Sequence, residues 1–123
     1  MKVFVYGTLK NGHGNNYFLK GAEFLGEANT TKDFTLYIPV NENGYVTSFP
    51  YAVEEKSDIG IKGELYKINP DILRSLDHLE SYPGFYDRKI IEVKTDDGSS
   101  DAWIYHIDKD NLFGGYYATA LEY

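Results

Sequence analysis

Residues 3–16 read VFVYGTLKNGHGNN, an apolar run that ends abruptly in a glycine-rich loop. The apolar run predicts a buried strand over residues 2–6, and Gly7, Gly12 and Gly14 lie in the loop over residues 7–14. Asn15 is the predicted cap of a short helix through residues 17–19. Backbone N–H groups that no Cβ atom obstructs suit a carboxylate, a phosphate or a developing oxyanion. The loop is therefore a candidate anion-binding site, and the alternative is a tight connection that needs glycine only for its positive φ angles.

This loop does not carry a nucleotide-binding motif. A phosphate-binding P-loop has the pattern Gly-x-x-x-x-Gly-Lys-Ser/Thr, and here the correctly spaced Gly7 and Gly12 are followed by His13 and Gly14. The dinucleotide fingerprint Gly-x-Gly-x-x-Gly is absent as well. The sequence thus predicts a site for a small anion and not for a nucleotide.

The composition is that of an ordinary globular protein and argues against several function classes. We expect the 123 residues to form one domain, residues 1–123, and the 12 Tyr and 7 Phe favour a β-rich fold. The net charge of −7 argues against nucleic acid or an anionic membrane as the main partner. The absence of Cys excludes disulfides and thiolate chemistry. Because the N-terminus reads as a strand and no stretch is long enough to span a membrane, we expect a cytosolic protein.

Hydrophobic patterning and turn signals predict one main helix and about seven strands. The expected strands cover residues 2–6, 23–30, 33–40, 45–55 (interrupted at Pro50), 59–68, 86–95 and 100–107. Asn69, Pro70 and Asp71 predict the start of the helix, which runs to about Glu80. Turn residues at 41–44 and 96–99 predict antiparallel hairpins. The expected fold class is α+β, with a small, mixed but mainly antiparallel, barrel-like sheet, the main helix and the short helix after the first strand. The pattern gives no structure for residues 108–123.

Glu80 lies on the face of the predicted helix that should be buried. With about 100° per residue, Ile72, Leu76 and Leu79 form an apolar arc that includes Glu80, and Asp77 lies at its margin. Burial and the negative end of the helix dipole both disfavour a carboxylate, so both should raise the pKa of Glu80. Such a carboxyl group can take up and return a proton near pH 7. The alternative is that the helix frays after Leu79 and Glu80 turns to water.

Arg88 follows an aromatic turn over residues 82–86 and is a second candidate site residue. It could bind a substrate carboxylate, or it could form a structural salt bridge with Asp87 or Glu80. Other constellations are weaker: the three histidines lack the spacing of metal ligands, and there is no Gly-x-Ser-x-Gly nucleophile elbow. Glu64 and Glu80 are a conceivable glycosidase pair, but nothing in the sequence fixes their separation.

Four motifs together resemble the γ-glutamylcyclotransferase-like family. They are VYGTLK at residues 5–10, Asn15 after Gly12, GELY at residues 63–66, and LDxLExYPxxYxR at residues 76–88. The motifs occur in the family's order and cover nearly the whole chain. The short chain is more similar to the γ-glutamylamine-type branch than to the glutathione-degrading branch.

The resemblance implies a small barrel-type domain that cyclises a γ-glutamyl group to 5-oxoproline and releases an amine without a cofactor or metal. It assigns the general acid/base role to Glu80. The expected substrate-binding residues are Tyr6, Gly7, Thr8, Leu9, Tyr86 and Arg88. The family usually has Gly after the catalytic Glu, whereas this chain has Ser81, for which a left-handed conformation costs roughly 1 kcal/mol more than for Gly.

Two other functions fit the same scaffold. The pocket could bind an α-amino acid without turnover, or the barrel could serve only as an interaction scaffold. A lone acid on a buried helix face favours the enzyme, because a binding module has no need to bury it.

Overall fold

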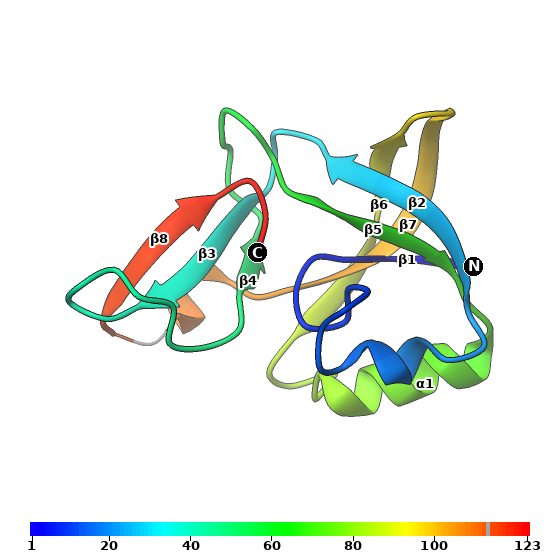
Figure 1. The fold of residues 1–123 in the computed structure, drawn as a ribbon, viewed down its shortest axis with the longest axis horizontal. Helices are drawn as coiled ribbons and strands as arrows, with labels where there is room; N and C mark the ends of the chain where they lie inside the picture. Colours follow the sequence, from blue (N-terminus) through cyan, green and yellow to red (C-terminus); the bar gives the residue numbers. More distant parts are fainter. Residues whose placement is uncertain (113) are drawn as a thin grey trace.

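The computed structural model describes residues 1–112 and 114–123, and its main feature is a closed five-stranded barrel (Figure 1). Around the barrel the strands follow the order β1 (Lys2–Val5), β5 (Lys62–Lys67), β2 (Glu23–Thr30), β6 (Asp87–Thr95) and β7 (Gly98–His106). All neighbours are antiparallel except β1 and β7, which close the barrel as a parallel pair through Val3 and Trp103. The predicted α+β class with a mixed, mainly antiparallel barrel is confirmed.

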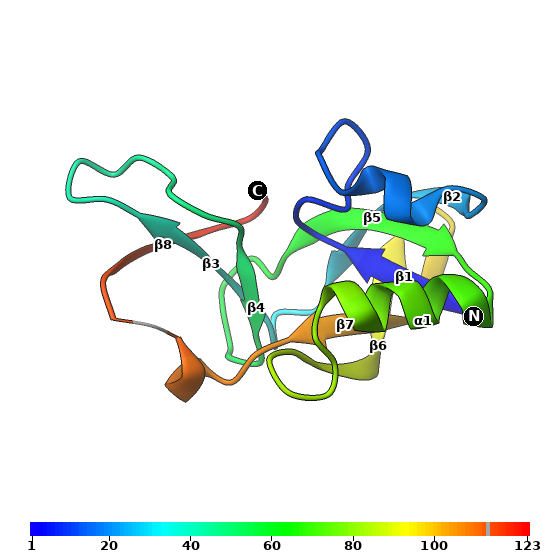
Figure 2. The same cartoon turned by 90° about the horizontal axis from the view of Figure 1, so that it is seen from below.

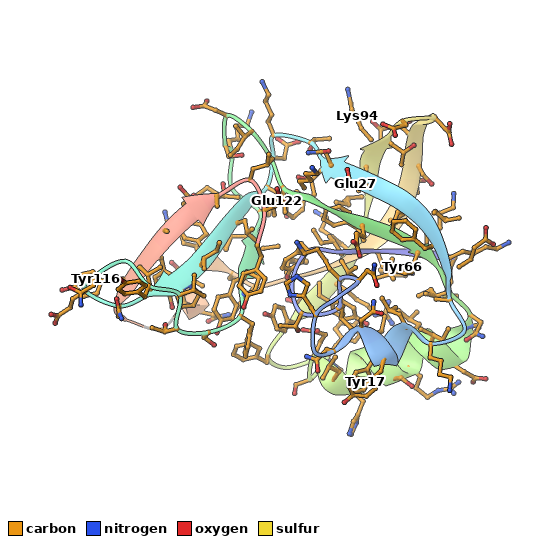
Figure 3. The ribbon with its side chains drawn as sticks, in the orientation of Figure 1. Tyr17, Glu27, Tyr66, Lys94, Tyr116 and Glu122 are labelled. Carbon is orange, nitrogen blue, oxygen red and sulfur yellow. The ribbon has the colours of Figure 1, made fainter. Side chains whose placement is uncertain are left out.

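A separate sheet of three strands extends from one end of the barrel. Its order is β4 (Tyr51–Val53), β3 (Thr35–Val40) and β8 (Tyr116–Ala120), and both pairings are antiparallel. The segment without a predicted structure thus supplies β8 and a short 3-10 helix, η2 (Lys109–Asn111). In Figure 3 Tyr116 lies far out on this sheet, and Lys94 marks the β6–β7 hairpin at the other end of the molecule.

The main helix, α1 (Pro70–Leu79), runs along one side of the barrel (Figure 2). As predicted, Asn69 is its cap: the side-chain oxygen accepts a hydrogen bond from Ile72 N at 2.8 Å. The short helix, η1 (Asn16–Leu19), is present as well, with Asn15 at its N-cap position as predicted, although the Asn15 side chain makes no capping hydrogen bond. Asn15 donates its side-chain N–H to Thr8 Oγ1 at 2.8 Å, because the loop folds back on itself. No helix of the described residues is long and apolar enough to cross a membrane.

Two predicted strands are shorter than expected. Residues 45–55 contribute only β4, because an irregular segment containing Pro50 precedes it, and the predicted strand over 59–68 begins at Lys62. Gly60 has a φ of +70°, and carbonyl oxygens of Thr30 and Thr31 lie within 3 Å of where its Cβ would be, so the chain turns there before the strand starts. The β6–β7 hairpin has a tighter turn than expected, since Thr95 and Gly98 already pair.

The core consists of two clusters of buried side chains, and β1 separates them. Val3 and Val5 face the cluster under α1, whereas Phe4 and Tyr6 face the cluster inside the barrel. Successive residues of a strand point to opposite faces, so a strand that is buried on both faces must be apolar throughout. The strand therefore delivers the loop that follows it to the boundary between the two clusters.

Candidate active site

A cavity of about 230 Å³ lies between the end of β1, the C-terminal end of α1 and the segment before β4. It is lined by residues 6–9 and Asn15 of the glycine-rich loop and by residues 79–81 at the helix end. Its remaining wall is mostly apolar and aromatic, and is formed by Phe4, Val5, Phe49, Pro50, Phe85, Tyr86 and Tyr105. The loop and Glu80, about seventy residues apart in sequence, thus share one cavity.

Hydrogen bonds within the loop leave part of its backbone without a partner. Thr8 O accepts from Asn15 N at 2.9 Å, and Leu9 O accepts from the side chain of Asn16 at 2.8 Å. In the part of the chain that the structure describes, the N–H groups of Gly7, Thr8 and Leu9 make no hydrogen bond. Three unsatisfied donors on a cavity wall are a place where a carboxylate or an oxyanion can bind.

Gly7 lies at a close approach of two segments. A Cβ atom on this residue would lie 3.0 Å from Pro50 Cγ and 3.2 Å from Pro50 Cδ. A side chain here would fit only if the Pro50 ring moved by a few tenths of an ångström. The glycine thus serves close packing, since its φ is not in the positive region that Gly12 adopts.

A Schellman motif ends α1 and fixes the direction of Glu80. Ser81 N donates to His78 O at 3.2 Å, and Tyr82 N donates to Asp77 O at 2.8 Å. Ser81 occupies the left-handed position of the motif with a φ of +53°. The helix therefore does not fray before Glu80, and the alternative in which this residue turns to water does not hold.

Within residues 1–112 and 114–123, the Glu80 carboxyl group has no hydrogen-bonding or ion-pair partner. It is half-buried, lines the cavity, and makes no hydrogen bond or ion pair within the described residues. Burial raises its pKa from 4.5 to about 7. A carboxyl group with this pKa is poised to exchange protons at neutral pH.

Tyr6 and Tyr86 add two neutral hydroxyl groups beside Glu80. The Tyr6 hydroxyl donates to Tyr105 O at 2.7 Å, and the Tyr86 hydroxyl lies 3.4 Å from Pro50 O, to which it donates. Burial is the main cause that raises the pKa of both phenols far above the usual value, so both keep their protons.

Arg88 is the predicted site residue that the structure does not bring into the cavity. Its guanidinium forms a two-pronged salt bridge with Asp77, at 2.8 and 3.1 Å, and lies over the rings of Tyr82 and Trp103. Neither of the predicted ion-pair partners, Asp87 and Glu80, is the partner observed. The other predicted site residues all line the cavity.

The remaining candidates from the sequence lie elsewhere. Glu64 accepts hydrogen bonds from Asn11 N and the Tyr66 hydroxyl and does not line the cavity, so it does not form a carboxylate pair with Glu80 there. The described residues contain no cluster of three or more side chains that could bind a metal ion. Sequence reasoning missed Tyr105 and Phe49 as cavity residues, since both come from segments that only the closed fold brings to Glu80.

Residues 3–120 match the family described as gamma-glutamyl cyclotransferase, AIG2-like. The chain belongs to this family. A relative from Methanocaldococcus jannaschii, provisionally named a gamma-glutamylcyclotransferase, is 33% identical over 105 residues, which are 84% of this chain and 81% of the relative. Gamma-glutamylaminecyclotransferase A from Danio rerio is 32% identical over 108 residues, which are 83% of this chain and 64% of the relative.

The cyclotransferase fold is also seen in solved structures. The crystal structure of an AIG2-like protein from Mus musculus matches with a TM-score of 0.75 and 26% identity, covering 99% of this chain and 86% of the mouse chain. Membership of the family confirms the predicted resemblance and the prediction of a gamma-glutamylcyclotransferase-like enzyme.

Proposed function

We propose that the protein converts γ-glutamyl amines to 5-oxoproline and free amine, with Glu80 as the general acid and base. The observation that carries the proposal is the position of Glu80: a half-buried carboxyl group of pKa about 7, without a protein partner, in the same cavity as the unpaired N–H groups of residues 7–9. Proton transfer and anion binding are the two functions that cyclisation requires.

The proposed reaction has two steps. The ionised Glu80 first takes a proton from the α-ammonium group of the substrate, and the neutral amine attacks the γ-carbonyl carbon to close a five-membered ring. The carbonyl oxygen becomes an oxyanion, which backbone N–H groups of the loop stabilise. The oxyanion then re-forms the carbonyl, and the bond to the leaving amine breaks as Glu80 returns the proton to that nitrogen. The ionised Glu80 takes the second proton from the ring nitrogen and passes it to the released amine, which departs as an ammonium ion. Because the attack is intramolecular, the main task of the cavity is to hold the substrate in its bent form.

The cavity wall favours a leaving group without a carboxylate. Phe49, Pro50 and Phe85 are apolar, and no Lys or Arg of the described residues lines the cavity. A γ-glutamyl amino acid would place a second carboxylate beside these residues with no cation to pair it. We therefore place amines ahead of amino acids as leaving groups, in line with the name of the Danio rerio relative.

The test is a panel of γ-glutamyl amines, γ-glutamyl amino acids and glutathione, with released 5-oxoproline as the readout. We expect the highest kcat/KM for the amines, and a loss of at least about 100-fold in Glu80→Gln, which keeps the shape but not the titrating proton. Glu42→Gln makes the same substitution in an exposed turn and should leave turnover unchanged.

Two results would contradict the proposal. Substantial turnover by Glu80→Gln would assign the proton transfer to another group. Binding of γ-glutamyl compounds without any released 5-oxoproline, measured by calorimetry, would identify a binding module. Asp77→Asn is not a suitable control, because Asp77 is paired with Arg88 directly behind the site.

A further inference from the structure

Tyr105 makes one hydrogen bond to each of the two elements that carry the site. Its hydroxyl donates to Asp77 Oδ1 on α1 at 2.7 Å, and its backbone oxygen accepts the Tyr6 hydroxyl at 2.7 Å. Tyr105 is only 3% exposed and lines the cavity itself. One residue of β7 thus contacts the helix that ends in Glu80 and the strand that leads into the loop.

The carboxylate that Tyr105 contacts is held on its other side by Arg88. Arg88 on β6 and Tyr105 on β7 are directly paired, so their side chains lie on the same face of the sheet. Trp103 is two residues before Tyr105 on β7, so its side chain lies on that face as well. The Arg88 carbon Cζ lies 4.2 Å from the centre of the Trp103 ring and 4.4 Å from that of Tyr82. A guanidinium held between two rings and bonded twice to one carboxylate has little freedom to move.

This cluster also holds the turn that follows Glu80. Asp77 O accepts from Tyr82 N, and the Tyr82 ring lies against Arg88, so both ends of the segment over residues 77–82 are attached to the barrel. Glu80 lies between these two attachments. Its own carboxyl group makes no hydrogen bond or ion pair within the described residues, so its direction depends on the segment that carries it.

We propose that Tyr105 is a positioning residue for the reaction, which, through Asp77 and Arg88, holds the helix end that carries Glu80 at a fixed distance from the substrate loop. This inference rests on the proposed function, because positioning matters only if Glu80 transfers protons to a group bound at the loop. A displacement of about 1 Å between reacting groups can lower a rate 100-fold. Within the described residues Tyr105 makes no hydrogen bond to Glu80, and it is not assigned a step of the chemistry.

The test is Tyr105→Phe, which keeps the ring and the backbone oxygen and removes only the hydroxyl that holds Asp77. We expect kcat to fall about 10- to 100-fold while KM changes less than about twofold, because substrate binding survives and alignment is lost. We also expect the pKa of Glu80, followed by carboxyl NMR, to fall toward 4.5, since a loosened helix end lets water reach the carboxyl group. Three titratable side chains interact electrostatically with Glu80: Tyr6, Tyr86 and Tyr105. Tyr6 and Tyr86 are unchanged in the variant, and burial raises the pKa of Tyr105 far above its usual value, so the substitution removes a neutral hydroxyl and no charge.

Tyr37→Phe is a matched control. Its hydroxyl also donates to a carboxylate, that of Glu55, which is paired with Lys109, but this cluster lies on the three-stranded sheet and outside the cavity. The control should change neither kcat nor the pKa of Glu80. Arg88→Lys gives a second test, since it keeps the charge but cannot form both bonds to Asp77, and it should act in the same direction as Tyr105→Phe.

The outcomes separate the two proposals. If wild type releases no 5-oxoproline from any substrate, the proposed function fails, and with it a positioning role in that reaction; the NMR measurement then tests only whether the Tyr105 hydroxyl holds the helix end that carries Glu80. A pKa of Glu80 that moves in Tyr105→Phe but not in Tyr37→Phe supports positioning. A pKa that stays unchanged in Tyr105→Phe overturns it, whatever happens to turnover.

Discussion

At the scale of single residues, Glu80 is unusual because the fold raises the pKa of its carboxyl group to about 7, so both protonation states are populated near neutral pH. Burial is the cause, since no charged neighbour and no hydrogen bond accounts for the raised pKa. The same burial that prepares the group for proton transfer must therefore weaken the fold once the group is ionised. Stability and reactivity are coupled through one side chain.

This coupling predicts a pH-dependent difference between wild type and Glu80→Gln. Below pH 4.5 the Glu80 carboxyl group is protonated in both the folded and the unfolded chain. Between pH 4.5 and about 7 only the folded chain keeps this proton. The free energy of unfolding of wild type therefore falls as the pH rises through this window. Above pH 7 the variant should be more stable than wild type by about 3 kcal/mol. Urea unfolding at several pH values measures this, with Glu42→Gln as the control. Equal stability of the two proteins at pH 8 would mean that the carboxylate is well solvated.

The same ionisation of Glu80 should appear in the pH profile of activity, as a rise in kcat/KM near pH 7.

At the scale of elements, the backbone is strained at Ser81, just after the end of α1, and the surrounding hydrogen bonds hold it in this conformation. Ser81 holds the left-handed position of the Schellman motif at a φ of +53°, where Gly is the usual residue. The two backbone hydrogen bonds of the motif and the attachment of Tyr82 to Arg88 keep it there. The sequence departs from the family pattern at Ser81, but the geometry of the helix end is that of an ordinary C-cap.

Relieving this strain should stabilise the protein. Ser81→Gly is expected to add about 1 kcal/mol to the free energy of unfolding and to keep the direction of Glu80, so kcat should change little. Ser75→Gly is the matched control: Ser75 is exposed in the interior of the same helix, and the substitution there should cost about 0.5–1 kcal/mol. Thermal unfolding of the two variants decides the matter, and a loss of stability in both would show that Ser81 makes contacts that outweigh the strain.

At the scale of the whole molecule, the neighbouring barrel strands β1 and β5 approach each other very closely at Gly63. Gly63 has no room for a side chain: a Cβ atom would lie 2.3 Å from Val5 O and 2.8 Å from Phe4 Cζ. Val5 ends the strand that leads into the glycine-rich loop, so the packing at Gly63 fixes the start of that loop. The glycine in the GELY motif is thus explained by packing.

Gly63→Ala should therefore be strongly destabilising. We expect a loss of about 2–3 kcal/mol, since the strands must separate to admit the methyl group. The midpoint of urea unfolding measures the loss. Gly14→Ala is the control, because nothing lies within 4 Å of the added atom and φ is not positive there. Equal midpoints for the two variants would contradict the close packing of β1 against β5 at Gly63.

The sequence by itself determined the features that depend on local patterns. Asn69 and Pro70 define the start of α1, the apolar arc defines its buried face, and Glu80 lies on that face because of its spacing from Leu76. The alternation along residues 87–106 predicted the longest hairpin, although its turn is two residues long where four were expected. These features follow from helical and strand periodicity and from caps, which involve residues close together in the chain.

Only the tertiary structure decided which distant groups meet. Closure of the barrel brings the loop to Glu80, pairs Arg88 with Asp77 in place of Asp87 or Glu80, and places Tyr105 between the two halves of the site. The strand β8 was missed for the same reason, since its mixed sequence becomes a strand by pairing with β3, about eighty residues earlier. Periodicity tells which face of an element is buried but not which element covers it, so partners far apart in sequence follow only from the closed fold.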